Sequence, residues 1–172
     1  MPAMTDPLLA QIPARPGSYV LWLAATRRQR IIVGSLGALA VQPGVYAYAG
    51  SAQGPGGLRA RLRHHLGVAR RLHWHVDYLR RVTQPLELWL CEDPQASEHA
   101  WAAALGATAG AAMPLARFGA SDCSCPAHLL RFAALPDFTT LAPRVQAATG
   151  ARRPALRVTV DGAIVGAARE RA

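Results

Sequence analysis

The chain has 172 residues and a formal net charge of +9, with 19 basic side chains against 10 acidic ones. About half of its residues are apolar, which is enough to bury a core within one domain of ordinary size and excludes a largely disordered chain. No apolar run reaches the length of a membrane span, and the N-terminus lacks the features of a signal peptide. We therefore expect a cytoplasmic protein with no membrane partner.

All 19 basic residues are arginine. Arginine can hydrogen-bond two phosphate oxygens at once, which a lysine ammonium cannot do in the same planar geometry. The positive charge is concentrated between Arg59 and Arg81, where seven arginines and four histidines accompany a single acid, Asp77. This distribution favours a polyanionic partner such as nucleic acid. The alternative is a basic surface that only keeps the protein soluble.

The first elements predicted are strands that form a small antiparallel sheet after an N-terminal tail, residues 1–15. Aromatic and β-branched residues predict a strand over 18–25, after the Pro16-Gly17 turn signal. Further strands are predicted over 31–36 and 44–50, the latter after a second Pro-Gly pair. These strands are close enough in sequence to be joined by short connections.

Helices are predicted to follow the sheet. The spacing of the leucines between residues 57 and 71 predicts an amphipathic helix with arginines on its other faces, and residues 72–81 form a second helical segment. A strand over 85–91 precedes a helix that begins at the Ser97 cap and ends near Gly106. The fold class is therefore α/β (α+β), with a small antiparallel central sheet flanked by helices.

The composition changes near residue 136, so we divide the chain into a domain over 16–135 and a short C-terminal extension over 136–172. The extension begins small and polar. Alternating residues around Asp161-Gly162 then predict a hairpin. No residue of the extension belongs to a recognisable catalytic pattern.

Most of the candidate chemistry lies between residues 44 and 65. An alternating strand carries Tyr46 and Tyr48 on one face, a glycine-rich turn follows, and the next helix is rich in arginine and histidine. A phenol, a guanidinium and an imidazole at one strand-to-helix corner suit phosphodiester hydrolysis, which requires a proton acceptor and neutralisation of charge on phosphorus. The alternative is an edge strand followed by a solvated basic helix.

The tripeptides at 17–19 and 48–50, followed by Leu58, Arg61, His65 and Glu98, resemble the paired signatures of the GIY-YIG nuclease superfamily. Segments 44–65, 72–79 and 118–129 are together similar to a small, largely uncharacterised branch of that superfamily. Members of the branch occur alone or fused to endonuclease III-type glycosylases. The resemblance covers roughly residues 16–132.

The resemblance implies a catalytic role for each matching residue. Tyr48 would activate the attacking water, Arg61 would steady the phosphate, and His65 would orient the site. Tyr19 would help to shape the pocket, and Glu98 would hold one divalent metal, Mg²⁺ or Mn²⁺. The function implied is a metal-dependent DNA endonuclease, structure- or lesion-directed, in DNA repair.

The DNA partner expected from this reading is branched, single-stranded or damaged. We expect contacts to it from the basic residues around the site, namely Arg59, Arg63, His64, Arg70, Arg71, His73 and His75. Ser51 stands where many relatives have a lysine, so one phosphate contact is missing. Two alternatives remain: a non-catalytic nucleic-acid-binding domain that retains the nuclease fold, and a partner subunit of a repair complex.

A second cluster consists of Cys123, Cys125 and His128, which lie within six residues. Two thiolates and an imidazole can bind zinc, and His73 or His75 could supply the fourth ligand. The spacing is not that of a standard zinc finger, and three cysteines in all argue against a disulfide framework. We expect these residues to be packing residues without zinc, or part of the wall of the active cleft.

Overall fold

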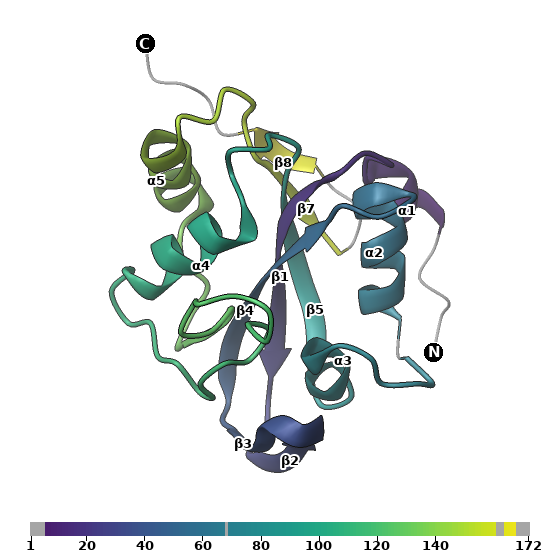
Figure 1. Ribbon diagram of the computed structural model, residues 1–172, viewed down its shortest axis with the longest axis vertical. Helices are drawn as coiled ribbons and strands as arrows, with labels where there is room; N and C mark the ends of the chain where they lie inside the picture. Colours follow the sequence, from purple (N-terminus) through teal and green to yellow (C-terminus); the bar gives the residue numbers. More distant parts are fainter. Residues whose placement is uncertain (1–5, 68, 161–163, 168–172) are drawn as a thin grey trace.

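A six-stranded antiparallel sheet forms the centre of the protein in a computed structural model that describes residues 6–67, 69–160 and 164–167 (Figure 1). The strand order is β6-β4-β1-β5-β7-β8. The strands are β1 (Gly17–Ala25), β4 (Gly44–Ala52), β5 (Gln84–Cys91), β6 (Leu129–Phe132), β7 (Leu156–Thr159) and β8 (Ile164–Ala167). A separate hairpin contains β2 (Gln29–Val33) and β3 (Gly37–Val41), with a short 3₁₀ turn over Gly34–Leu36.

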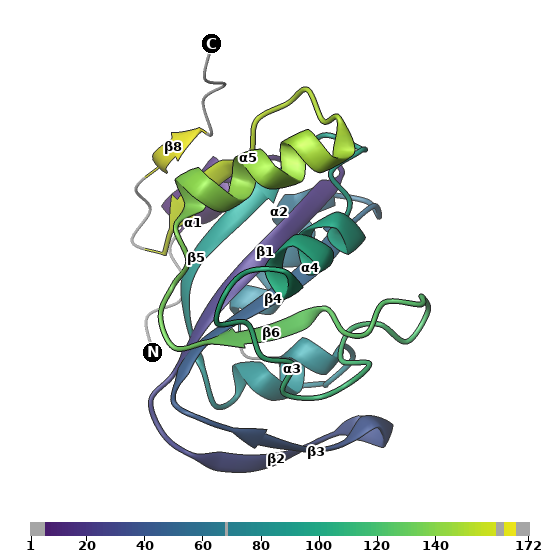
Figure 2. The same ribbon diagram turned by 90° about the vertical axis from the view of Figure 1, so that its left-hand side faces the viewer.

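Helices cover both faces of the sheet (Figures 1 and 2). They are α1 (Asp6–Gln11), α2 (Gly57–Leu66), α3 (His75–Arg80), α4 (Glu98–Gly106) and α5 (Phe138–Thr149). One buried cluster lies between the sheet and α1, α2 and α3, and the other lies between the sheet and α4 and α5. The expected α+β fold with helices flanking a central antiparallel sheet is confirmed.

The central strand β1 explains why a double-sided core forms. Its odd-numbered side chains, such as Tyr19 and Leu21, belong to the cluster under α2, while Val20 and Trp22 belong to the cluster under α4. All four are buried, so the strand is apolar on both faces. Antiparallel sheets commonly expose one face to solvent, but this strand is covered on both. The continuous apolar sequence of β1 therefore fits a strand covered on both faces.

Three predicted elements differ from the structure. The second helical segment, predicted over 72–81, is helical only from His75 to Arg80. The helix predicted over 57–71 ends at Leu66, where Gly67 forms the C-cap. The carbonyls of His65 and Leu66 are bound by the Arg80 guanidinium, which supports the helix end at that place. The strand predicted over 31–36 ends at Val33, residues 34–36 form the 3₁₀ turn, and the strand belongs to the β2–β3 hairpin and not to the central sheet.

The predicted tail and extension both pack on the domain. In the tail, Leu8 and Leu9 of α1 and Ile12 directly after it are buried in the core, and in the extension β7 pairs with β5 of the sheet. Helix α5 was not predicted: Asp137 caps it by accepting from the Thr139 amide, and it packs against α4. The turn of the predicted hairpin, 161–163, lies outside the described residues. Within the described part of the chain, no helix is long and apolar enough to cross a membrane.

Candidate functional site

A cavity of about 330 Å³ opens where β1, β4, α2 and the start of α4 come together. The loop between α4 and β6 completes its wall through Gly119, Ser121, Asp122 and His128. Four residues that the resemblance assigns to the site line this one cavity: Tyr19, Tyr48, Arg61 and Glu98. The fold therefore brings side chains together that are up to 79 positions apart in the sequence.

The two tyrosines come from neighbouring strands. In the β1–β4 register Tyr19 lies opposite Gly50 and Leu21 lies opposite Tyr48, so the rings are diagonal neighbours, with centroids 6.3 Å apart. A Cβ atom at Gly50 would collide with the Tyr19 ring. The glycine that ends the second tripeptide signature thus gives Tyr19 room to lie across β4.

Both phenols are almost completely buried at the base of the cavity; Tyr48 is 6% exposed. Burial raises the pKa of Tyr48 above its usual value, and the Arg61 guanidinium acts in the opposite direction. Burial likewise raises the pKa of Tyr19, and the neighbouring Tyr48 adds to the effect. Each phenol consequently holds its proton at neutral pH unless further positive charge enters the cavity.

Arg61 is held at the cavity by an aromatic neighbour. Its guanidinium carbon lies 4.4 Å from the centroid of the Trp74 ring, within the range of a cation–π contact. Leu58, Leu62 and Leu66 on the same helix face the core. That apolar face fixes the rotation of α2 and places Arg61 beside the two phenols.

His65 lies behind the cavity and is fully buried. Its ring centroid is 5.8 Å from that of Tyr19 and 6.2 Å from that of Tyr48. Within the described residues neither ring nitrogen has a hydrogen-bond partner, because the nearest carboxylate oxygen, Oδ1 of Asp77, is 3.6 Å from Nδ1. Burial lowers the pKa of His65, although Asp77 opposes this, so the neutral ring is favoured.

Asp77 was not predicted as a site residue, although it is the single acid of the basic segment. Its carboxylate accepts hydrogen bonds from the backbone amides of His73 and Trp74 and lies 3.1 Å from Nε2 of His64. The same carboxylate faces His65. Asp77 therefore ties α2 to the segment that begins α3 and stands behind the cavity.

Glu98 lies in the first turn of α4, directly after the N-cap residue Ser97, whose hydroxyl accepts from the amide of Ala100. Its side chain is partly exposed and lines the cavity, and Asp122 lines it from the opposite loop. One or two carboxylates beside open space are the ligands from which proteins bind Mg²⁺ together with water and substrate phosphates. The residues present therefore fit a hard divalent cation.

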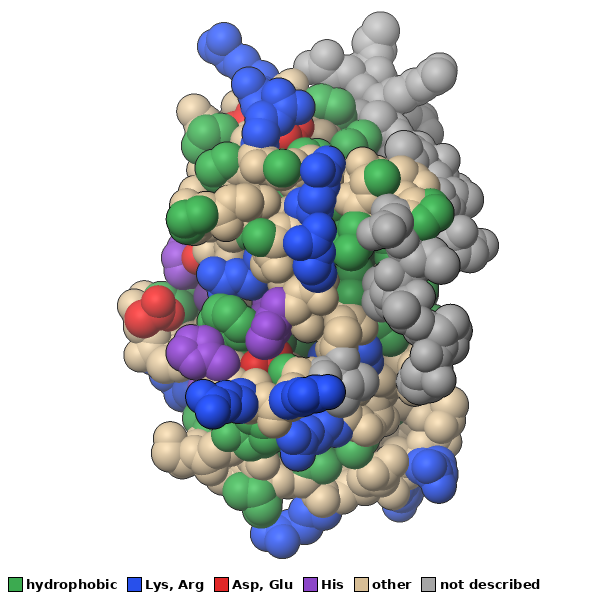
Figure 3. Space-filling model, turned by 90° about the vertical axis from the view of Figure 1, so that its right-hand side faces the viewer, with side chains coloured by type: hydrophobic (Ala, Val, Ile, Leu, Met, Phe, Trp, Pro, Cys, Tyr) green, Lys and Arg blue, Asp and Glu red, His purple; other side chains and the backbone are tan. Residues whose placement is uncertain are grey.

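The basic residues predicted to contact DNA separate into two groups. Arg63, Arg70, Arg71 and His73 are exposed. Figure 3 shows the face that carries α1, α2 and α3, where arginine side chains are spread over the surface, histidines gather near one edge, and acidic side chains are few. This surface continues to the cavity, because His73 also lines it.

The remaining three predicted contacts are bonded within the protein. Arg59 donates to the carbonyl of Ile12 at 2.7 Å, which fastens α1 to α2. His64 is paired with Asp77, as described above, and Nδ1 of His75 accepts from the Gly119 amide at 2.9 Å. His75 still lines the cavity, but this hydrogen bond leaves only one ring nitrogen for other contacts.

The cysteine cluster acquires a fourth side chain that the sequence did not indicate. His99, on α4, lies beside Cys123, Cys125 and His128, whereas the sequence suggested His73 or His75 for this position. A further group of metal-ligand type contains His64, His65 and Asp77. The described residues thus contain two groupings of potential metal ligands in addition to Glu98.

The comparisons with known proteins identify a family. The family model described as "Domain of unknown function DUF123" matches residues 18–150, which include every residue that lines the cavity. No curated protein and no solved structure matches the chain. The match extends through α5 and stops before β7. The chain belongs to the DUF123 family.

Proposed function

We propose that the chain is a metal-dependent endonuclease that hydrolyses phosphodiester bonds in branched, single-stranded or damaged DNA by GIY-YIG-type chemistry. The observation that carries the proposal is the cavity: Tyr19, Tyr48, Arg61 and Glu98, from four different elements, all line it. The exposed arginines beside it suit a phosphate backbone. DNA repair in the cytoplasm is the setting that this substrate class suggests.

The proposed chemistry assigns one task to each side chain. Arg61 neutralises the charge that develops on the non-bridging phosphate oxygens, held in place by Trp74. A Mg²⁺ or Mn²⁺ ion at Glu98 would supply Lewis-acid stabilisation of the leaving oxygen and additional positive charge. The water oxygen forms a bond to phosphorus as the bond from phosphorus to the leaving oxygen breaks; the water gives its proton to the oxygen of Tyr48, and the leaving oxygen takes a proton from solvent. Tyr48 can accept this proton only after its own hydroxyl has ionised to a phenolate. Burial opposes that ionisation, so it depends on the positive charge of Arg61 and of the bound cation.

A second function has an observation in its favour. Because the raised pKa of Tyr48 opposes its use as a base, the cavity could serve a nucleic-acid-binding domain that does not cleave. Trp74 and the exposed His73 beside Arg61 provide an aromatic and cationic surface on which an unpaired base can stack. The two functions differ in one measurable result, which is strand cleavage.

The experiment is a cleavage panel. Labelled duplex, single-stranded, flap and abasic DNA are incubated with the protein in Mg²⁺, in Mn²⁺ and in EDTA. Tyr48→Phe should lower cleavage by about 100-fold or more while DNA affinity is retained. Tyr46→Phe is the matched control, because Tyr46 lies on the same strand face and bonds through its hydroxyl to the backbone of Gln42.

Glu98→Gln tests the metal assignment on the same substrates. It removes the charge with little change of shape, so cleavage should fall and should require more metal to reach half its maximum. Undiminished cleavage by Tyr48→Phe, or cleavage that persists in EDTA, contradicts the nuclease mechanism. Tight, salt-sensitive binding without cleavage of any substrate by the wild-type chain would support the binding-domain alternative.

A further inference from the structure

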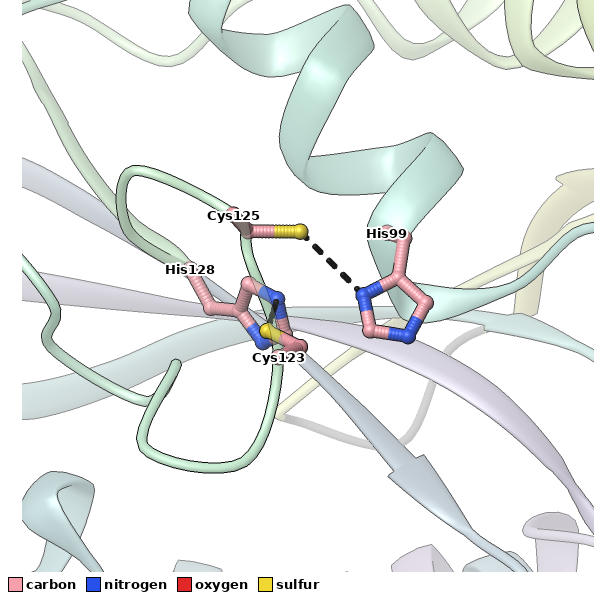
Figure 4. Close-up of side chains that lie close together, drawn as sticks. All are labelled: His99, Cys123, Cys125 and His128. Atoms are coloured by element: carbon pink, nitrogen blue, oxygen red, sulfur yellow. Dashed lines mark hydrogen bonds between the residues drawn. The ribbon is translucent and has the colours of Figure 1, made fainter.

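Four side chains that bind soft divalent metals lie together beside the cavity. His99 comes from the first turn of α4, and Cys123, Cys125 and His128 come from the loop that precedes β6 (Figure 4). Sγ of Cys125 lies 3.2 Å from Nδ1 of His99, and Sγ of Cys123 lies 3.5 Å from Nε2 of His128. One potential ligand atom from each residue lies within 4.8 Å of all the others.

These separations can be compared with a tetrahedral zinc centre. Zn–S bonds of about 2.3 Å and Zn–N bonds of about 2.0 to 2.1 Å place the ligand atoms of a regular tetrahedron about 3.4 to 3.8 Å apart. The two sulfur–nitrogen distances, 3.2 and 3.5 Å, are already near this range. Small rotations of the side chains would bring the remaining pairs into it.

The loop is held in position by contacts that do not use the ligand atoms. The Arg117 guanidinium donates to the carbonyls of Cys125 and Cys123, at 2.7 and 2.6 Å. The His128 amide donates to the carbonyl of Phe118, and the His128 carbonyl accepts from the amide of Ala49 in β4. The backbone therefore presents both thiols and the imidazole of His128 toward α4 before any metal binds.

The second nitrogen of His99 has the surroundings expected of a metal ligand. Nδ1 faces the sulfur of Cys125, while Nε2 lies 3.6 Å from Oε1 of Glu98. A carboxylate near the non-ligating nitrogen is a common partner of zinc-bound histidine, because it orients the ring and raises its basicity. The His99 side chain is about half exposed, which leaves a route by which a metal can reach the site.

We propose that His99, Cys123, Cys125 and His128 form a structural Zn²⁺ site that fastens the loop of residues 117–128 to the start of α4. Two thiolates and two imidazoles favour Zn²⁺ over Mg²⁺, and four protein ligands leave no open coordination position. The site is separate from the cation at Glu98 and does not depend on the proposed nuclease function. It also replaces the expectation that the cysteines only pack, because α4 supplies the missing fourth ligand.

The first test measures metal in the purified full-length chain by mass spectrometry. We expect about one zinc per chain in the wild-type protein and in Cys91→Ser. Cys91 is the matched control, because it is a buried cysteine of β5 outside the cluster. Cys125→Ser and His99→Ala should each lose most of the zinc. Absence of stoichiometric zinc from the wild-type chain, or unchanged zinc in both cluster variants, would overturn the proposal.

A second test uses only the wild-type chain, so it remains informative if the variants do not fold. Zinc is removed with a chelator, and Co²⁺ is then added. We expect visible absorption typical of tetrahedral cobalt with thiolate ligands, saturating at one equivalent and displaced by Zn²⁺. Removal of zinc should lower the melting temperature by more than about 5 °C. Cobalt binding without thiolate character, or an unchanged melting temperature, would contradict the proposal. No DNA is present, so this result is independent of the cleavage assay.

Discussion

Asp77 is the buried acid on which the structure behind the cavity depends, and its replacement gives a measurable test. The Oδ2 atom accepts from the backbone amides of His73 and Trp74 at 2.9 and 3.0 Å, and Oδ1 lies 3.1 Å from Nε2 of His64. Asp77→Ala removes all of these acceptors. Asp77→Asn keeps one oxygen that can still accept from both amides but removes the charge.

The hydrogen bonds of Asp77 determine how much stability each variant should lose. A hydrogen bond to a charged group contributes about 1.5 to 3 kcal/mol, and Asp77→Ala leaves two partly buried amides without their acceptor, so we expect a loss of about 3 to 5 kcal/mol in the free energy of unfolding. Asp77→Asn should cost only about 1 to 2 kcal/mol, since both amides keep a neutral acceptor. The difference between the two variants measures the acceptor separately from the charge.

Because the Asp77 carboxylate is charged, the stability lost on its replacement should depend on pH. Burial by itself would raise the pKa of Asp77, but the facing His65 ring, the hydrogen bonds from the amides of His73 and Trp74, and the hydrogen bond with His64 hold that pKa well below its usual range. A carboxylate whose pKa is lower in the folded state contributes stability above its unfolded pKa of about 4, and this contribution is lost as the pH falls through that value toward the folded pKa. The stability difference between wild type and Asp77→Asn should therefore shrink below about pH 4.

The assay is urea unfolding followed by tryptophan fluorescence, for wild type and both variants, at several pH values between 7 and 3. The quantity to compare is the difference in free energy of unfolding between wild type and Asp77→Asn. Asp93 and Asp137 also have lowered pKa values, but they are present in every variant, so their contributions cancel in this difference. Equal destabilisation by Ala and Asn at pH 7 would refute the role given to the amide hydrogen bonds. A difference that stays constant down to pH 3 would refute the role given to the charge.

Two further predictions concern the arginines. Arg80 is buried and donates to three backbone carbonyls, so Arg80→Met should lower the free energy of unfolding by about 3 to 5 kcal/mol, whereas the exposed Arg63→Gln should change it by less than about 0.5 kcal/mol in the same urea assay. DNA affinity should fall steeply with salt, and Arg63→Gln and Arg70→Gln should each reduce the slope of log K against log salt by about one unit in a fluorescence titration. A flat salt response would contradict the proposed DNA-binding surface.

The sequence predicted elements where local patterns dominate. Aromatic and β-branched residues after a Pro-Gly turn located β1, alternating residues after a second Pro-Gly pair located β4, and the Ser97 cap located the start of α4, because each signal depends on neighbours within a few positions. Helix α5 was missed because its composition is small and polar and Pro143 lies within it. Its buried residues do recur at helical spacing after the Asp137 cap, so a closer search for periodicity would have found it.

The site was predictable only as far as the resemblance extended. Tyr19, Tyr48, Arg61 and Glu98 could be named from motif positions, but their arrangement around one cavity required the strand register and the placement of α4. Asp77 was visible as the lone acid of a basic segment, yet its partners depend on how α2 packs against α3. No local pattern in the sequence shows that contact.

The first turn of α4 connects the two proposed metal sites. Glu98 and His99 are adjacent in sequence, but Glu98 lines the cavity and His99 belongs to the cysteine cluster. The carboxylate also lies near the His99 ring, so any displacement of His99 acts directly on Glu98. Zinc bound to the four-residue cluster would fix both the start of α4 and the loop that carries Asp122, which are the two cavity walls with carboxylates. A soft-metal site would thereby determine the geometry available to a hard cation at Glu98.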